Sequence, residues 1–324
     1  MNNKNDPKII FWGTAEFAAD ILAGVLKEYP IAAIVTQPDK PTGRHQIVES
    51  PAVKKLAQEL GIPVLQPEKL KSNQELIDRL KELKPDLFIV AAYGQKITKE
   101  ILAIPKYVSL NVHPSLLPKY RGSSPVQAAI YNGDEETGVT IMLVDEEMDH
   151  GPVISDLRFQ IKDGSTPLTT GLRLTTGELK HELAKVGVKL LLETLPKWLA
   201  GEIKPQEQEH NKATITKILT REDGRIDWSR SAEEIDQQIR AYTPWPGCYT
   251  EIAGKRLKII KARIIESKEK VKAGQILKTA VGEMAVSFGK DNLILDTVQL
   301  AGKKEVNGKD FLNGHPEMIG KVLK

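Results

Sequence analysis

The sequence of 324 residues contains a single cysteine, Cys248. One thiol cannot form an internal disulfide or supply a cysteine zinc cluster, so both are excluded. No apolar run approaches the roughly 18 residues that a membrane-spanning helix needs. Residues 1–8 lack the apolar core of a secretion signal and the arginine-rich pattern of an organelle transit peptide. We therefore expect a cytoplasmic protein that makes no contact with a membrane.

The sequence also lacks the glycine pattern of a dinucleotide-binding site. Lys8–Trp12 is a short apolar run, followed by Gly13 and by helical spacing from Glu16 to Leu26. A strand, a tight turn and a helix in this order open a doubly wound sheet. The nicotinamide fingerprint needs three closely spaced glycines, but the next glycine after Gly13 is Gly24. The pattern therefore argues against a nicotinamide cofactor.

The residues that are present are ordinary in amount but unevenly distributed. The 40% hydrophobic and 27% charged residues are typical of a globular protein, and the length favours two domains. The net charge is only +3, yet nine basic residues stand against two acidic ones within Ile252–Lys278. The C-terminal part therefore holds the positive surface, which is the charge that a nucleic-acid backbone attracts.

Strand and helix patterns alternate over the first part of the chain. Apolar runs that predict strands lie at residues 8–12, 31–36, 63–66, 86–92 and 108–112. Their alternation with helices predicts an α/β fold with a Rossmann-like, doubly wound parallel sheet, whose ligand crevice lies at the carboxyl ends of the strands. Gln37–His45 is rich in turn-forming residues and is predicted to be irregular. Leu168–Leu199 has a helical pattern, which Gly171, Gly177 and Gly187 are predicted to interrupt.

The pattern changes after Gly201–Lys212, a polar stretch that is typical of a linker. Ser231 and Glu234 have the spacing of a capping box at the start of a helix. Short alternating runs between residues 248 and 300 are separated by glycine turns and predict a small, OB-like β-barrel. We therefore predict a catalytic domain over residues 1–206, which includes the start of the linker, and a C-terminal domain over residues 207–324.

The stretch Val108–Gly122 holds the residues most suited to chemistry. It begins as an alternating strand, so Asn111 and His113 are expected on one face. Pro114 and Pro118 then end the strand and bracket a short, fixed loop. An imidazole titrates near neutral pH, and a carboxamide polarises a carbonyl group without changing its own charge. Taken singly, however, each of the two residues is more often structural than catalytic.

Taken together, Asn111, His113 and the Ser-Leu-Leu-Pro of residues 115–118 resemble the signature of the folate-dependent formyltransferase family. The family's Met/Leu-Asp-x-Gly pattern is matched at Met148, Asp149 and Gly151. Other motifs occur in the order found in the branch that formylates methionyl-tRNA. They are Ile-Ile-Phe-x-Gly-Thr, Thr-Gln-Pro-Asp-Lys-Pro-x-Gly-Arg, Ala-Tyr-Gly, Glu-Thr-Gly-Val-Thr-Ile-Met, Ile-Asp-Trp and Pro-Trp-Pro-Gly. The resemblance covers nearly the whole chain.

This resemblance implies an activity and a set of roles. The formyl group of 10-formyltetrahydrofolate would move to the α-amino group of initiator methionyl-tRNA, a step that serves translation initiation. Asn111 would donate a hydrogen bond to the oxyanion, and His113 would shuttle the proton. Asp149 would orient the imidazole or act directly as the base. No metal is required, and we expect a monomer.

The resemblance also suggests where the two substrates bind. The folate co-substrate would lie between two strand ends, in contact with Ser115, Leu116, Leu117, Pro118, Ala92, Tyr93 and Gly94. The tRNA would be held by basic residues, namely Arg44, Lys217, Lys255, Arg256 and Lys258. Any one of these lysines is as often a solvated residue on a strand as a phosphate contact. The cluster therefore indicates nucleic-acid binding better than any single member does.

Some points stay open at this stage. His150 and Pro152 depart from the residues common in the family beside Asp149, and a second imidazole there affects how protons are shared. His113, Asp149 and His150 are a poor metal site, because adjacent residues on a turn rarely point at one ion. The same trio occurs in formyltransferases of amino-sugar nucleotides and in 10-formyltetrahydrofolate hydrolases. A nonenzymatic RNA-binding protein is the alternative from another class. The loop up to Arg44 and the basic C-terminal part favour tRNA.

Overall fold

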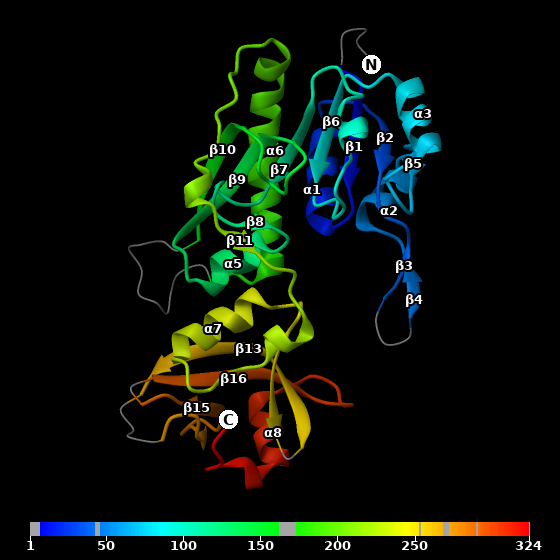
Figure 1. The fold of residues 1–324 in the computed structure, drawn as a ribbon. Helices are drawn as coiled ribbons and strands as arrows, with labels where there is room; N and C mark the ends of the chain where they lie inside the picture. The colour runs from blue at the N-terminus through cyan, green and yellow to red at the C-terminus, as the bar shows by residue number, and fades with distance from the viewer. Residues whose placement is uncertain are drawn as a thin grey trace. The chain divides into compact units, whose positions relative to one another are not determined.

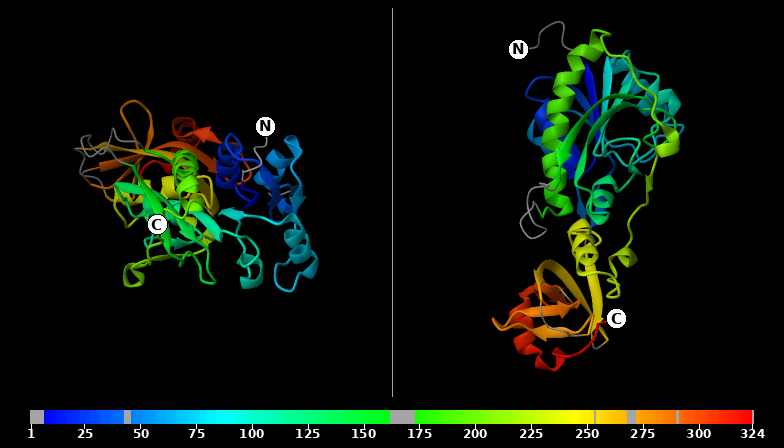
Figure 2. Two further views of the ribbon diagram at one scale, coloured as in Figure 1. Left: turned by 90° about the horizontal axis from the view of Figure 1, so that it is seen from above. Right: turned by 90° about the vertical axis from the view of Figure 1, so that its left-hand side faces the viewer.

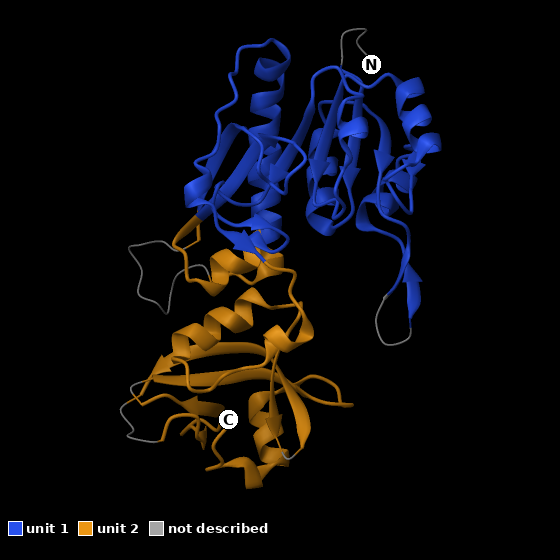
Figure 3. Ribbon diagram, in the orientation of Figure 1, with its two compact units in different colours: residues 1–125, 137–159, 180–216 blue, residues 126–136, 160–179, 217–324 orange. Residues whose placement is uncertain are grey.

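The computed structural model describes residues 7–42, 46–161, 173–252, 254–267, 272–289 and 291–323. The chain divides into two compact units (Figure 3). Unit 1 comprises residues 1–125, 137–159 and 180–216, and unit 2 comprises residues 126–136, 160–179 and 217–324. Arg44 and Gly171 lie outside the described residues. The domain boundary between residues 206 and 207 stays a prediction.

Unit 1 is built around a seven-stranded sheet (Figure 1). Its strands, in spatial order, are β10 (Val153–Gln160), β9 (Glu136–Leu143), β7 (Ser109–His113), β6 (Leu87–Ala91), β1 (Ile9–Gly13), β2 (Ile31–Val35) and β5 (Val64–Leu65). The strands from β7 to β5 are parallel to one another, whereas β9 is antiparallel to β7. The predicted Rossmann-like sheet is confirmed in its parallel part, and the antiparallel strand β9 extends it beyond β7.

Helices cover both faces of this sheet. They are α1 (Glu16–Val25), α2 (Ala52–Glu59), α3 (Gln74–Leu83), α4 (Lys99–Leu102) and α6 (Thr176–Leu199). On one face, Trp12, Val35 and Phe88 pack with Ile77 and Leu80 of α3 in a buried cluster. On the other face, α6 lies against α1 and β7 (Figure 2). Because both faces are covered, the parallel strands are apolar on both sides, which explains their continuous apolar runs in the sequence.

Glycine allows α6 to lie close to its neighbours. A Cβ atom at Gly187 would lie 2.9 Å from Cδ1 of Ile21 in α1 and 3.1 Å from Cγ1 of Val112 in β7. The prediction that Gly187 interrupts the helix is wrong, because α6 is continuous through it, whereas Gly177 is the second residue of α6, which begins at Thr176. Tertiary packing here outweighs the roughly 1 kcal/mol of helix propensity that glycine costs relative to alanine.

The segment predicted to be irregular, Gln37–His45, is partly regular. β3 (Lys40–Thr42) pairs antiparallel with β4 (Ile47–Glu49). Both strands of a two-stranded ribbon have an open edge, so a proline that donates no amide is tolerated in β3. Asp39 anchors the entry to this hairpin by accepting hydrogen bonds from Lys54 and Gln66, and these bonds lower the pKa of its carboxyl to about 2.

Unit 2 contains a six-stranded antiparallel sheet. Its strands are β12 (Cys248–Ile252), β13 (Lys255–Glu266), β16 (Asp291–Leu300), β15 (Met284–Ser287) and β14 (Ile276–Lys278) in spatial order, with β17 (Val306–Asn307) paired to β16. Every one of these pairings is antiparallel. The predicted change from an α/β sheet to a small antiparallel domain is therefore confirmed.

The helices of unit 2 include α7 (Ala232–Ala241), whose start the sequence predicted. Ser231 Oγ accepts a hydrogen bond from the Glu234 amide, and the Glu234 carboxylate accepts one from the Ser231 amide. Further described helices of unit 2 are α5 (Pro125–Tyr131), from its second residue on, and α8 (Gly308–Gly314), and 3-10 turns lie at Arg221–Gly224 and Pro316–Met318. Another 3-10 turn, His210–Lys212, belongs to unit 1. No helix within the described ranges is long and apolar enough to cross a membrane.

Candidate active site

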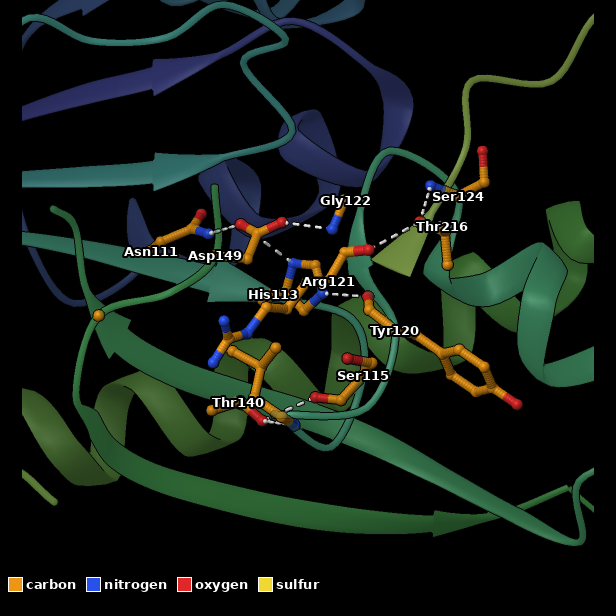
Figure 4. A network of polar contacts seen from close by, with 12 residues as sticks. Asn111, His113, Ser115, Tyr120, Arg121, Gly122, Ser124, Thr140, Asp149 and Thr216 are labelled. Carbon is orange, nitrogen blue, oxygen red and sulfur yellow. Dashed lines mark hydrogen bonds and ion pairs between the residues drawn. The ribbon is translucent and has the colours of Figure 1, made fainter. Parts of the chain in front are cut away.

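The strand β7 presents Asn111 and His113 on the same face. Val112, between them, points toward α6, as its contact with a Cβ atom at Gly187 requires. Side chains alternate along a strand, so its two neighbours project from the opposite face. Figure 4 shows both of them directed at Asp149. The one-face arrangement expected from the sequence therefore brings the amide and the imidazole to one carboxylate.

Asp149 lies in the turn between β9 and β10, and its carboxylate meets two hydrogen-bond donors and one imidazole nitrogen. Its Oδ1 accepts a hydrogen bond from Asn111 Nδ2 at 3.3 Å and lies 3.6 Å from His113 Nδ1. Its Oδ2 accepts a hydrogen bond from the Gly122 amide at 2.8 Å. The side chain is 15% exposed, so the carboxylate is largely shielded but reachable by a ligand. The predicted trio of Asn111, His113 and Asp149 therefore converges at one point.

The proton positions on His113 follow from its second contact. Its Nε2 lies 3.0 Å from the carbonyl oxygen of Tyr120, which can only accept a hydrogen bond. Nε2 therefore carries a hydrogen, and Nδ1 is the ring atom that gains or loses a proton. Nδ1 faces the Asp149 carboxylate, whose Oδ1 lies 3.6 Å away. The imidazole is thus fixed at Nε2 by the Tyr120 carbonyl and turned with Nδ1 toward Asp149.

The loop after β7 is fixed by its own polar groups. Ser115 Oγ donates to the Lys119 carbonyl at 2.6 Å. Thr140 on β9 donates to the Ser115 carbonyl at 2.7 Å and accepts from the Leu117 amide at 3.1 Å. The role of Thr140 cannot be predicted from the sequence, because a threonine in an apolar strand carries no distinctive pattern. The Ser115 hydroxyl therefore serves the loop, while Leu116, Leu117 and Pro118 stay half-buried at its surface.

The strand end assigned to the folate presents main chain rather than an aromatic ring. Ala92 and Gly94 are exposed and have positive φ angles of 41° and 81°. The Tyr93 side chain is buried and packs edge-on against Trp12 at 5.2 Å between ring centroids. Burial raises the pKa of the Tyr93 hydroxyl well above its usual range. β6 and β7 are parallel neighbours, so this end and the Ser115–Pro118 loop leave the sheet at the same edge.

The polar stretch predicted as a linker is bound to the active-site loops. We call residues 206–216 the strap. Gln206 pairs with Val153 through two main-chain hydrogen bonds, and Thr214 Oγ1 accepts from the Tyr120 amide at 2.8 Å. β11 (Ile215–Thr216) pairs in parallel with β8 (Arg121–Gly122). Sequence patterns missed the strap because most of these bonds use main-chain atoms, which any residue carries.

The basic residues assigned to tRNA differ in their surroundings. Lys217 forms an ion pair with Asp223, and this contact lowers the pKa of the Asp223 carboxyl. Arg256 stacks over the Tyr249 ring, with its guanidinium carbon 3.8 Å from the ring centroid. Lys255 and Arg256 are exposed on β13, and Lys258 is half-buried on the same strand. The three β13 residues thus lie close together along one strand, whereas Lys217 already has a carboxylate partner.

His150, which departs from the family pattern, is engaged away from Asp149. Its Nδ1 lies 2.7 Å from Asp145 Oδ2, and its ring stacks on His210 of the strap at 4.1 Å between centroids. Among the described residues, no group of three or more histidine, cysteine or carboxylate side chains is placed to hold a metal ion.

Gly151 controls how closely the Asp149 turn approaches β9. A Cβ atom at this position would lie 2.1 Å from the Leu143 carbonyl oxygen, and a main-chain atom cannot move aside as a flexible side chain can. We expect Gly151→Ala to displace the turn and to lower the turnover number by about tenfold or more, because misplaced catalytic groups lose rate steeply. Steady-state kinetics checks this, with Gly314→Ala as the control, because a Cβ atom at this exposed glycine meets nothing within 4 Å. Wild-type turnover in Gly151→Ala would contradict it.

Comparison with known proteins agrees with this geometry. Residues 7–186 match the family model described as formyl transferase, and residues 218–316 match the model of the formyl transferase C-terminal domain. A methionyl-tRNA formyltransferase of Roseiflexus castenholzii is 44% identical over 310 residues, which cover 95% of this chain and 96% of the relative. One of Bacillus subtilis is 39% identical over 318 residues, covering 98% and 97%. The chain therefore belongs to the formyl transferase family, in the branch of the methionyl-tRNA formyltransferases.

Solved structures share the fold at lower identity. HypX from Aquifex aeolicus in complex with tetrahydrofolic acid has a TM-score of 0.63 and 18% identity, and the match covers 97% of this chain and 48% of HypX. WlaRD, a sugar 3N-formyl transferase, has a TM-score of 0.60 and 22% identity, with 92% and 99% covered. At these identities the structures establish a common fold over nearly the whole chain.

Proposed function

We propose that this chain transfers the formyl group of 10-formyltetrahydrofolate to the α-amino group of initiator methionyl-tRNA. The observation that carries the proposal is the convergence of Asn111 and His113 on the Asp149 carboxylate, within 3.6 Å. A carboxamide, an imidazole and a carboxylate suit acyl transfer to an amine, which needs an electrophile activated and a proton removed. The names of the relatives point to the tRNA acceptor rather than to a sugar or to water.

In this proposal each side chain has one task. His113 takes a proton from the attacking amine at Nδ1, because Nε2 is already committed to the Tyr120 carbonyl. Asp149 stabilises the imidazolium that results, since its Oδ1 faces Nδ1. When the tetrahedral intermediate collapses, the bond from the formyl carbon to the folate nitrogen breaks, and the imidazolium returns its proton to that nitrogen, which leaves as tetrahydrofolate. Asn111 Nδ2 carries two hydrogens, and one is donated to Asp149. The second is available to the oxygen that gains negative charge as the amine attacks.

The residues at the strand edge fit a folate donor. A pterin is a flat ring system with polar edges, so it needs apolar side chains and a few main-chain donors or acceptors. Leu116, Leu117 and Pro118 supply half-buried apolar groups, and Ala92 and Gly94 supply exposed main chain. The donor contributes the activated formyl group, and these residues would hold it beside the trio. Ser115 and Tyr93 would support the site from beneath, because their side chains are turned inward.

The tRNA would be bound largely through its phosphates. Lys255, Arg256 and Lys258 on β13 are proposed as the main contacts, with Lys217 and Arg44 as further ones. The proposed division of labour assigns catalysis to residues 1–206 and tRNA binding to residues 207–324. Charged initiator tRNA is used where translation begins, so the cytoplasm stays our prediction for the location.

The proposed function is tested by acceptor choice. The purified protein is given 10-formyltetrahydrofolate carrying a radiolabelled formyl group, with charged initiator tRNA, an amino-sugar nucleotide or no acceptor. We expect label on the methionyl-tRNA alone. Label on the sugar, or release of formate at the same rate without acceptor, would refute the assignment and favour a sugar formyltransferase or a hydrolase. Binding of tRNA without any transfer would favour a nonenzymatic RNA-binding protein.

The tRNA contacts predict a salt dependence. Each neutralised phosphate contributes roughly −0.7 to −0.9 to the slope of log affinity against log salt. Five contacts would weaken tRNA binding by roughly 100- to 500-fold between about 50 and about 200 mM salt. Arg256→Gln and Lys258→Gln should each reduce the slope by about one, while Lys81→Gln on α3 should leave it unchanged. Filter-binding titrations measure this, and a flat profile would rule out the basic strand as a tRNA surface.

A further inference from the structure

One side chain of the strap holds the main chain on both sides of the catalytic turn. Gln208 Nε2 donates a hydrogen bond to the carbonyl oxygen of Asp149 at 3.0 Å and another to that of Gly151 at 2.7 Å. Both hydrogens of this amide are therefore used on the segment that carries the carboxylate. Gln208 is buried, although its strap neighbours Glu207 and Glu209 are exposed. A polar side chain buried in this way acts through its hydrogen bonds.

Gln208 is itself fixed from the other side. Its Oε1 accepts hydrogen bonds from Nε and Nη2 of Arg121 at 3.1 and 2.7 Å. The same Nη2 lies 2.8 Å from Nδ1 of His210, whose ring stacks on His150. Arg121 is also buried, and its neighbour Gly122 donates its amide to the Asp149 carboxylate. The Gln208 amide thus joins the two loops that meet at Asp149.

Asp149 needs such support because of its backbone. Its φ angle is +50°, in the left-handed region that residues other than glycine adopt only at a cost in energy. A residue in this conformation keeps it when the surrounding contacts determine it. The Asp149 side chain is held by Asn111 and Gly122, and its carbonyl is held by Gln208. Without the latter bond, the peptide after Asp149 loses the contact that fixes its carbonyl, so the turn can relax and move the carboxylate relative to His113.

We propose that Gln208 is a positioning residue for formyl transfer, which holds Asp149 in register with His113 through main-chain hydrogen bonds. This inference rests on the proposed function. The strap ends at Thr216, the last residue of unit 1 before the chain enters unit 2. In this proposal, a residue of the strap therefore sets the geometry of Asn111, His113 and Asp149. Gln208 does not contact the reacting atoms and contributes through Asp149 alone.

The test compares three variants of the full-length protein. Gln208→Leu keeps the size of the side chain and removes its hydrogen bonds. Gln208→Glu keeps an acceptor for Arg121 but loses the N–H groups that reach Asp149 and Gly151. Gln206→Leu is the matched control, because this strap residue is exposed and binds Val153 through main-chain atoms. We expect both Gln208 variants to lower kcat by about tenfold or more, with KM for either substrate changed by less than about twofold.

A double-mutant cycle separates positioning from a general structural effect. If Gln208 acts through Asp149, Gln208→Leu should cost nothing further in an Asp149→Asn background. Equal losses in both backgrounds, or wild-type kcat in Gln208→Glu, would overturn the proposal. Thermal unfolding of each variant confirms that the protein is folded at the assay temperature.

A spectroscopic measurement keeps this inference separate from the proposed function. The nitrogen NMR signals of the His113 ring report the surroundings of Nδ1, whatever the acceptor of the formyl group is. They should shift in Gln208→Leu and stay in place in Gln206→Leu. Unchanged His113 signals in Gln208→Leu would refute the positioning role even if the wild type formylates tRNA. If the wild type had no transfer activity, the proposed function would be refuted. The NMR signals of His113 would still show whether Gln208 positions the Asp149 turn.

Discussion

Replacing Asp149 by asparagine should lower kcat for formyl transfer by about a hundredfold or more. The substitution keeps the size of the side chain but removes the negative charge that faces His113 Nδ1. An amide can still accept the hydrogen bond from Gly122 through its oxygen, so the turn is expected to stay in place. Its NH2 group would then point at Nδ1 and donate to it, which occupies the lone pair that should take the proton from the amine.

Steady-state kinetics with saturating folate and methionyl-tRNA measures this loss. Asp156→Asn is the matched control, because Asp156 is an exposed carboxylate on β10 of the same unit. It should behave as the wild type does. A value of kcat within about twofold of the wild type in Asp149→Asn would remove the carboxylate from the mechanism. Loss in Asp156→Asn of similar size would mean that the overall charge matters rather than this group.

The Asn111→Ala variant is expected to lose about a hundredfold or more in kcat, which is the range observed when a donor to a developing oxyanion is removed. Its KM for methionyl-tRNA should change little, because the amide acts at the reacting carbonyl rather than on the nucleic acid. Asn111 also donates to Asp149, so the loss has two sources. One is the missing donor to the substrate oxygen, and the other is a less well held carboxylate.

The double variant Asn111→Ala with Asp149→Asn distinguishes these two sources. A donor to the substrate oxygen adds a loss to that of Asp149→Asn, whereas a residue that only holds Asp149 adds nothing. We expect a further loss of about tenfold or more in the double variant. An Asn111→Ala enzyme with the turnover of the wild type would exclude both roles.

The sequence predicts well those features that depend on local periodicity. The alternation around Val112 places Asn111 and His113 on one face, and the spacing of Ser231 and Glu234 predicts the start of α7. In both cases the physical cause acts within a few residues, so the pattern is visible in the chain. The parallel strands are equally visible, because burial on both faces leaves them almost wholly apolar.

Features that depend on distant contacts are not visible in this way. From the sequence alone, Gly187 predicts an interruption of the helix. The structure shows instead that the absence of a side chain allows close packing against Ile21 and Val112. The polar residues of the strap predict a linker. In the structure, however, the polar side chain of Gln208 is buried, because it donates hydrogen bonds to main-chain carbonyls of the Asp149 turn. The positive φ angle of Asp149 has no local cause such as glycine, so it could not be predicted. Resemblance to a family identified the aspartate itself, but not what holds it.

The path of the strap determines where two related enzymes can be joined in a chimera. A chimera joined at residue 206 would inherit residues 207–216 from a foreign parent, and with them whatever side chain replaced Gln208. The foreign parent would then alter the hydrogen bonds to the Asp149 turn, although the exchange was intended to change only the C-terminal part. A junction at Lys217 or later avoids this, because Gln208 and Asp149 then come from the same parent.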